Sequence, residues 1–163
     1  MATPQMEAPM NAQTNARMNT RMDAPMNTQT NKTDDLSEAF HFPQGLAGFR
    51  DALYFAFVYE GKGDIVCLQS IDQPEAALLL TQWDTSRLGR PPQLTPDQEQ
   101  CLKLAHGSEP MWMLVLNPFA DKEWVTANLM APVALNIEAR LGLQNILPDP
   151  KLPLRYHWMP QPK

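Results

Sequence analysis

The side chains that could bind a metal or act as a nucleophile are few in this sequence, and they lie far apart. Zinc sites usually place Cys and His in close pairs such as CxxC, and no such pair occurs. We therefore interpret the cysteines as buried thiols in a reducing compartment, with a disulfide or a metal site as the alternative. The residues concerned are His41, His106, His157, Cys67 and Cys101.

Ser70 and Asp72 are the one pair whose types and spacing could suggest a nucleophile beside a base. They lie in the stretch LQSID, where a turn at the end of a strand explains them better. No GxSxG, HExxH or phosphate-binding glycine loop is found elsewhere. The sequence therefore predicts no enzyme activity, no metal and no cofactor.

Charge and hydropathy limit the remaining functions. The chain has 163 residues, with 13 Lys and Arg against 18 Asp and Glu, for a net charge of −5. Such an acidic chain has no basic surface for nucleic acid, so any effect on RNA would come from capturing a basic protein. No secretory signal and no apolar run long enough to span a membrane occurs. We predict a cytoplasmic protein with no membrane partner and no direct nucleic-acid partner.

The first part of the chain has a composition typical of disorder. Residues 1–36 contain six of the ten Met but no Val, Ile, Phe, Tyr or Trp, and MEAPMNAQTN at 6–15 recurs as MDAPMNTQTN at 22–31. Such a segment buries too little apolar area to offset the entropy of ordering it. We predict a disordered arm over residues 1–39, with a partner-binding segment as the alternative. A folded domain over 40–159 and a short tail over 160–163 follow.

Short strands account for most of the predicted domain. Runs 53–59 and 65–71, joined by EGKGD, predict a hairpin. Run 76–81 could be helix or strand, and 111–117 is an apolar strand. A helix is expected at about 95–106, with a capping box from Thr95 and Gln98, Pro96 at its start and Gly107 at its end. Its inward side is expected to comprise Leu94, Cys101, Leu102 and Ala105.

Residues 125–147 predict a second hairpin. The odd-numbered apolar residues from Val125 to Ile137 would share one face of a straight strand. Pro132 interrupts this strand and requires an edge position or a bulge. EARLG reverses the chain, with Gly142 at the expected left-handed position. Many short antiparallel strands with one short helix predict an all-β fold, a small pseudobarrel or roll.

Four stretches in collinear order resemble the flagellar assembly factor FliW family. They are FPQGLAGF at 42–49, LQSIDQPEAALLL at 68–80, TANLMAPVALNIEARLGLQNIL at 126–147 and LPLRYHW at 152–158. The resemblance implies a mostly β pseudobarrel without catalysis. It also implies two partners, the RNA-binding regulator CsrA, whose repression of flagellin translation would be relieved, and flagellin itself. The structural residues of these motifs are Pro43, Gly45, Gly48, Phe49, Pro132 and Gly142.

One departure from the family concerns its first strand, of the form RFGEIEI. Here the corresponding region is NTQTNKTDDLSEAFH, which is polar and poor in strand-forming residues. We expect this strand to be lost, shortened or badly paired, so that the next strand has an exposed edge. Self-association through that edge, or its coverage by the arm, is the resulting hypothesis.

Candidate partner-binding residues are polar side chains near predicted turns and strands. An acidic face would comprise Asp72, Glu75, Asp121 and Glu123. Asn128, Asn136 and Gln144 are further candidates, although hydrogen bonds within turns and strands also explain them. Arg140 at the hairpin tip is either a contact residue or a solvated turn residue. Phe49, Val133 and Ile137 are expected in the core.

Two other functions are consistent with the sequence. The chain could be a β-barrel module that binds a small molecule or RNA directly, or a flagellin chaperone that does not bind CsrA. The lack of aromatic residues interleaved with Lys or Arg argues against RNA.

Overall fold

The computed structural model describes residues 38–58 and 63–163, and the folded unit spans Glu38–Lys163. Residues 1–37 of the predicted disordered arm and Gly61 of the first hairpin lie outside the described residues, and the domain boundaries stay predictions. No helix in the described ranges is long and apolar enough to cross a membrane.

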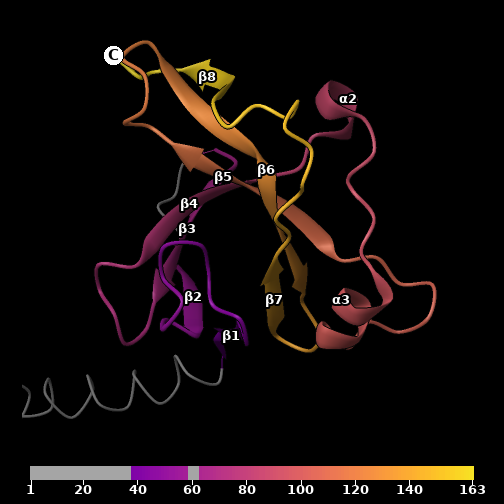
Figure 1. The fold of residues 1–163 in the computed structure, drawn as a ribbon. Helices are drawn as coiled ribbons and strands as arrows, with labels where there is room; N and C mark the ends of the chain where they lie inside the picture. The colour runs from indigo at the N-terminus through magenta and orange to yellow at the C-terminus, as the bar shows by residue number, and fades with distance from the viewer. Residues whose placement is uncertain (1–37, 59–62) are drawn as a thin grey trace, which may run out of the picture. The chain divides into compact units, whose positions relative to one another are not determined.

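Seven strands close into a barrel, which confirms the all-β pseudobarrel prediction (Figure 1). Around the barrel the order is β5, β4, β3, β2, β1, β7 and β6, and pairing of β5 with β6 closes it. All pairs are antiparallel except β1 with β7. The strand β8 lies outside the ring and pairs with the first part of β6. The elements are β1 (Phe40–His41), β2 (Tyr54–Val58), β3 (Ile65–Ser70), β4 (Ala77–Gln82), α2 (Thr85–Leu88), α3 (Pro96–Cys101), β5 (Met111–Asn117), β6 (Trp124–Asn136), β7 (Leu141–Gln144) and β8 (Tyr156–Pro160).

The predicted first hairpin is confirmed as β2 paired with β3. Phe55 pairs with Ser70 and Phe57 with Leu68, and the buried Phe55 and Leu68 face the barrel interior. The ambiguous run after this hairpin is a strand, β4, because its Leu80 joins the same interior cluster while Leu79 packs on the outer side. Alternation between two apolar faces suits a strand that is covered on both sides.

The long strand β6 changes the face that its odd-numbered residues occupy, so the prediction of one shared face is wrong. Met113 pairs with Val133 and Val115 with Asn128, so β5 advances two residues while β6 advances five. The three extra residues form a bulge, and an odd number of extra residues reverses the side-chain alternation. Val133 therefore lies in the barrel core, whereas Val125 packs outside beneath β8.

Pro132 lies within this bulge and is fully buried, which confirms a bulge rather than an edge position. The carbonyls of Met130 and Pro132 accept hydrogen bonds from the N–H groups of Leu147 and Asn145, at 2.7 and 2.8 Å. Proline thus stands where no N–H is needed for the ladder, while its carbonyl still has a partner.

The predicted helix is present but shorter, as α3. Thr95 and Gln98 form the expected capping box, with Pro96 at the first position. The helix ends because Leu102 inserts into the core and Lys103 adopts a left-handed φ of 52°. Gly107 is therefore not its terminator, and Ala105 is exposed instead of inward. The short helix α2 was not predicted, and Asp84 caps it by accepting the N–H groups of Ser86 and Arg87.

The turn between β6 and β7 corrects the predicted role of Gly142. Arg140, with φ of 56°, occupies the left-handed position, and Gly142 lies within β7. A Cβ atom at Gly142 would overlap the ring of Phe42, which is fully buried. The glycine is thus required for the close approach of an aromatic ring to the strand backbone.

Candidate protein-binding groove

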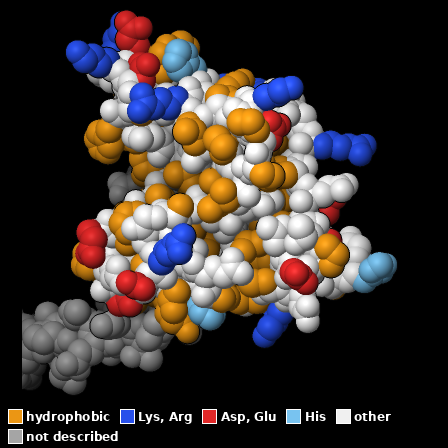
Figure 2. All heavy atoms as spheres, in the orientation of Figure 1, with side chains coloured by type: hydrophobic (Ala, Val, Ile, Leu, Met, Phe, Trp, Pro, Cys, Tyr) orange, Lys and Arg blue, Asp and Glu red, His pale blue; other side chains and the backbone are white. Residues whose placement is uncertain are grey.

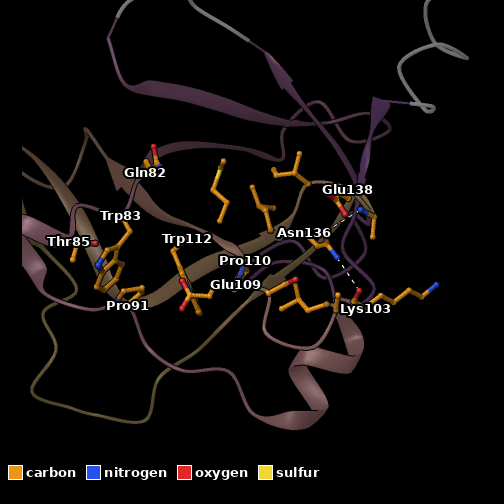
Figure 3. Close-up of a pocket in the computed structure, with 17 residues that line it drawn as sticks. Gln82, Trp83, Thr85, Pro91, Lys103, Glu109, Pro110, Trp112, Asn136 and Glu138 are labelled. Atoms are coloured by element: carbon orange, nitrogen blue, oxygen red, sulfur yellow. Dashed lines mark hydrogen bonds between the residues drawn. The ribbon is translucent and has the colours of Figure 1, made fainter.

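An open groove lies where β5 begins and β6 ends, and we call it the β5–β6 groove (Figure 3). Its volume is about 800 Å³. Residues from four separate stretches of chain line it, which is why no local motif marks it. They are Gln82, Trp83, Thr85, Pro91, Lys103, Leu104, Ala105, Ser108, Glu109, Pro110, Met111, Trp112, Leu135, Asn136, Ile137, Glu138 and Ala139.

The β5–β6 groove contains exposed apolar side chains among its polar lining. Met111 pairs with Leu135 across β5 and β6, and Trp112 follows with only 7% of its surface exposed. Met111 and Ile137 have exposed fractions of 39% and 43%, so the prediction that Ile137 lies in the core is wrong. Solvent-exposed apolar side chains that gather in one groove are typical of a binding surface.

Hydrogen bonds hold both walls of the groove in place. Asn136 donates from Nδ2 to the carbonyls of Leu102 and Lys103, at 2.8 and 3.3 Å, and thereby ties β6 to the end of α3. On the other wall, Trp83 donates from Nε1 to the carbonyl of Gly89 at 2.9 Å. A groove that is fixed in this way loses little conformational entropy when it binds a partner.

Charged side chains border the groove unequally. Glu109 and Glu138 are exposed, and neither makes a hydrogen bond or an ion pair through its carboxylate in the described part of the chain. Lys103 also lines the groove, but its side chain extends away from the centre in Figure 3. The β5–β6 groove therefore combines exposed apolar side chains with two carboxylates that have no counter-ion in the described part of the chain.

The polar residues predicted on β6 and β7 hold the fold together. Asn128 accepts the N–H of Met130 within the bulge, at 2.9 Å. Gln144 accepts the N–H of Ala47 at 2.7 Å and donates to the carbonyl of Ala131 at 3.2 Å, so it joins the loop after β1 to the bulge. Of the predicted contact residues, Asn136 alone lines the β5–β6 groove.

Arg140 is likewise engaged within the chain. Its guanidinium forms an ion pair with Glu38 at 2.8 Å, donates to the Glu38 carbonyl at 3.0 Å and lies 5.4 Å from the centre of the Phe40 ring. These contacts fasten the start of the described chain to the β6–β7 turn.

The four predicted acidic residues lie in two turns outside the groove. Asp72 accepts the hydroxyl of Ser70 at 3.0 Å, which agrees with a turn and not with a catalytic pair. The N–H of Glu123 donates to the carboxylate of Asp121 and is the main reason why the pKa of Asp121 lies below its usual value. Glu75 is exposed, as is Glu123. On the face that Figure 2 shows, acidic and basic side chains are interspersed.

The residues of the FPQGLAGF stretch form a turn over the barrel end. Gly45 has φ of +66°, and a Cβ atom there would overlap the backbone of Arg50. Gly48 also has positive φ, Pro43 is exposed, and Phe49 is partly buried against the core. Val133 is fully buried, as predicted.

The edge of β2 is only partly covered. Among the described residues, β1 pairs with β2 only at Phe55 and Tyr54, so Ala56 to Val58 have a strand on one side alone. The first strand is thus shortened in the described part of the chain, as predicted. Self-association through this edge stays a prediction.

A second groove lies between α2 and β8, and its Asp84 and Arg87 are both engaged within the chain. Arg87 lies 3.9 Å from the centre of the Trp158 ring and donates to the carbonyl of His157 at 3.3 Å. The hydroxyl of Ser86 donates to the Asp84 carboxylate and is the main cause that lowers the pKa of Asp84, and the same carboxylate caps α2 by accepting the N–H groups of Ser86 and Arg87. Arg87 thus covers part of the outer strand β8.

The described residues contain no group of three His, Cys, Asp or Glu side chains arranged to hold a metal. The geometry of the β5–β6 groove instead suits contact with another macromolecule.

Comparison with known proteins places this fold in a family. The sequence model of the FliW protein family matches residues 19–158. The chain belongs to the FliW family. The family match begins before Phe42, where the resemblance in the sequence begins, and so includes part of the predicted arm.

Several relatives named flagellar assembly factor FliW support this assignment. The chain is 31% identical to the FliW protein of Bdellovibrio bacteriovorus over 70% of this chain and 66% of the relative. It is 30% identical to that of Nitratidesulfovibrio vulgaris strain DP4 over 75% and 72%. A crystal structure of the flagellar assembly factor FliW shares the fold, with a TM-score of 0.65 and 23% identity over 74% of this chain and 85% of the other.

Proposed function

We propose that this protein is a non-enzymatic regulator of flagellum assembly that binds CsrA and flagellin in the cytoplasm. Membership of the FliW family is the observation that carries the proposal. In this view, binding of the protein to CsrA relieves repression of the flagellin mRNA, and flagellin competes for the same pool of protein.

The charge of the chain is consistent with this role. CsrA reads RNA with basic surfaces, and the chain has a net charge of −5. An acidic protein that binds beside such a surface repels the phosphate backbone electrostatically as well as blocking its access. The same charge disfavours direct binding of RNA.

Three measurements with purified proteins test this function. Size-exclusion chromatography and calorimetry would be performed with CsrA and with flagellin separately, followed by a gel-shift assay of CsrA on flagellin leader RNA. We expect a complex with each protein and release of the RNA when the chain is added. Release should weaken as salt increases, because charge contributes to the effect.

The outcomes separate the alternatives. A complex with flagellin but not with CsrA would identify a chaperone without regulatory activity. If neither complex forms, the function proposed here is wrong, and the alternative of a β-barrel module that binds a small molecule is favoured. A direct gel shift of the RNA by the chain alone would indicate an RNA-binding module.

A further inference from the structure

We propose that the β5–β6 groove binds a protein segment in which a basic side chain lies next to an apolar one. This inference rests on the proposed function, because it assumes a protein partner. It assigns the binding surface on this chain and the types of residue that the partner segment contains. Of the contact residues predicted from the sequence, only Asn136 lies in this groove.

The exposed apolar side chains of the groove are the reason why the segment must include an apolar residue. Met111 and Ile137 are about two-fifths exposed, at 39% and 43%, and Trp112 lies beside them in the lining. Covering such side chains removes apolar area from water, at roughly 25 cal/mol per Å² before the costs of association. The volume of about 800 Å³ accommodates a few side chains, and not a whole domain.

The basic part of the segment is required by the rim. Glu109 and Glu138 are exposed in the lining and have no counter-ion among residues 38–58 and 63–163, where the ion pairs join Arg140 to Glu38 and His157 to Asp121. Trp83 and Trp112 also line the groove, so a cation that binds there has indole rings in the same lining. The same chain shows that it can hold such a cation, because Arg87 stacks 3.9 Å from the Trp158 ring centre.

The same charges disfavour other occupants. Phosphate groups of RNA would be repelled by the two carboxylates, and a second copy of the chain would bring four such carboxylates together at a symmetric contact. A protein segment with a positive charge is therefore the occupant that matches both the floor and the rim.

The first experiment measures the affinity of the full chain for CsrA and for flagellin after charge reversal at the rim. We expect the double variant Glu109→Lys with Glu138→Lys to bind at least one of them about tenfold or more weakly, since two attractions become repulsions. The matched control is Asp51→Lys with Asp64→Lys, which changes the net charge equally at exposed acids that lie outside the groove and outside the predicted acidic face. Its affinity should change less than about threefold.

A milder variant distinguishes a loss of binding from misfolding. Glu109→Gln with Glu138→Gln removes the charge without introducing repulsion, and it should give a smaller loss in the same direction. Thermal unfolding of every variant should match that of the original chain, because both carboxylates are exposed and make no bond. Equal affinity of the rim and control variants for both proteins would overturn the inference while leaving the proposed function intact.

A second experiment maps the site even if neither protein binds. The probe is a synthetic peptide that alternates arginine and leucine with glycine, and the control peptide has glutamate in place of arginine. In a heteronuclear NMR titration we expect the indole N–H signals of Trp83 and Trp112 to move with the arginine peptide, and those of Trp124 and Trp158 to stay.

Equal shifts with both peptides, or shifts confined to the Trp158 signal, would show that the groove has no preference for a cation. Dimerisation of the chain that blocks the titration would assign the groove to a second copy and would also contradict the inference.

Discussion

The hairpin of β6 and β7 and the mouth of the β5–β6 groove use polar side chains in opposite ways. In the hairpin, Asn136 and Gln144 each make two or more hydrogen bonds to backbone groups of distant segments. At the mouth, Glu109 and Glu138 are exposed and bond to nothing in the described part of the chain. The first pair positions the elements, and the second pair is left available to a partner.

Hydrogen bonding and exposure therefore distinguish structural from functional polar residues. A buried or half-buried amide that satisfies backbone groups contributes stability, because its removal leaves those groups without partners. An exposed carboxylate beside an apolar floor contributes almost nothing to stability and is inexpensive to keep for binding. Substitution of Gln144, which lies outside the groove, should therefore change stability and leave affinity unchanged, whereas substitutions of Glu109 and Glu138 should do the reverse.

The largest effect is expected for Gly142→Ala in β7. The added methyl group would overlap the Phe42 ring, and both residues are fixed by the surrounding strands. Overpacking of this kind should lower the free energy of unfolding by about 2–3 kcal/mol, measured by urea denaturation. Gly48→Ala is the control, because its Cβ would meet no atom and only the positive φ of 87° is unfavourable, at a cost of about 1 kcal/mol. Equal losses for the two variants would mean that Phe42 can move away.

A smaller effect is expected for Gln144→Ala. The change leaves the N–H of Ala47 and the carbonyl of Ala131 without their side-chain partner. We expect a loss of about 1 kcal/mol in the free energy of unfolding, because the Ala47 N–H can still reach water. The control is Gln93→Ala, an exposed glutamine for which no hydrogen bond is found in the described structure, and it should be neutral. A weaker complex with CsrA or flagellin at unchanged stability would instead make Gln144 a contact residue.

Features that depend on neighbours in the chain could be predicted from the sequence. The capping box of Thr95 and Gln98 needs only residues three apart, and it is present as expected. The strands of the first hairpin and the disruption at Pro132 were also correctly inferred. Each of these depends on local backbone chemistry, which does not change with tertiary context.

Features that depend on contact between distant segments could not be predicted. The number of extra residues in the β6 bulge decides which face Val125 occupies, and it is set by the pairing with β5. Gly142 is needed for the approach of Phe42, whose position relative to β7 follows from barrel closure. For the same reason no sequence pattern indicated that Glu109 and Glu138 border one groove, and the exposed Ile137 was predicted in the core.

The smallest effect is expected for the ion pair of Arg140 with Glu38. Their side chains have exposed fractions of 41% and 70%, so solvent screens the attraction strongly. A double-mutant cycle with Glu38→Gln and Arg140→Gln should give a coupling of about 0.5 kcal/mol or less, and high salt should reduce it further. A coupling well above 1 kcal/mol that persists in high salt would mean that solvent does not screen the attraction between these two side chains. The contacts of Arg140 with the Glu38 carbonyl and the Phe40 ring do not enter this coupling, because the carbonyl and the ring are present with and without the Glu38 carboxylate.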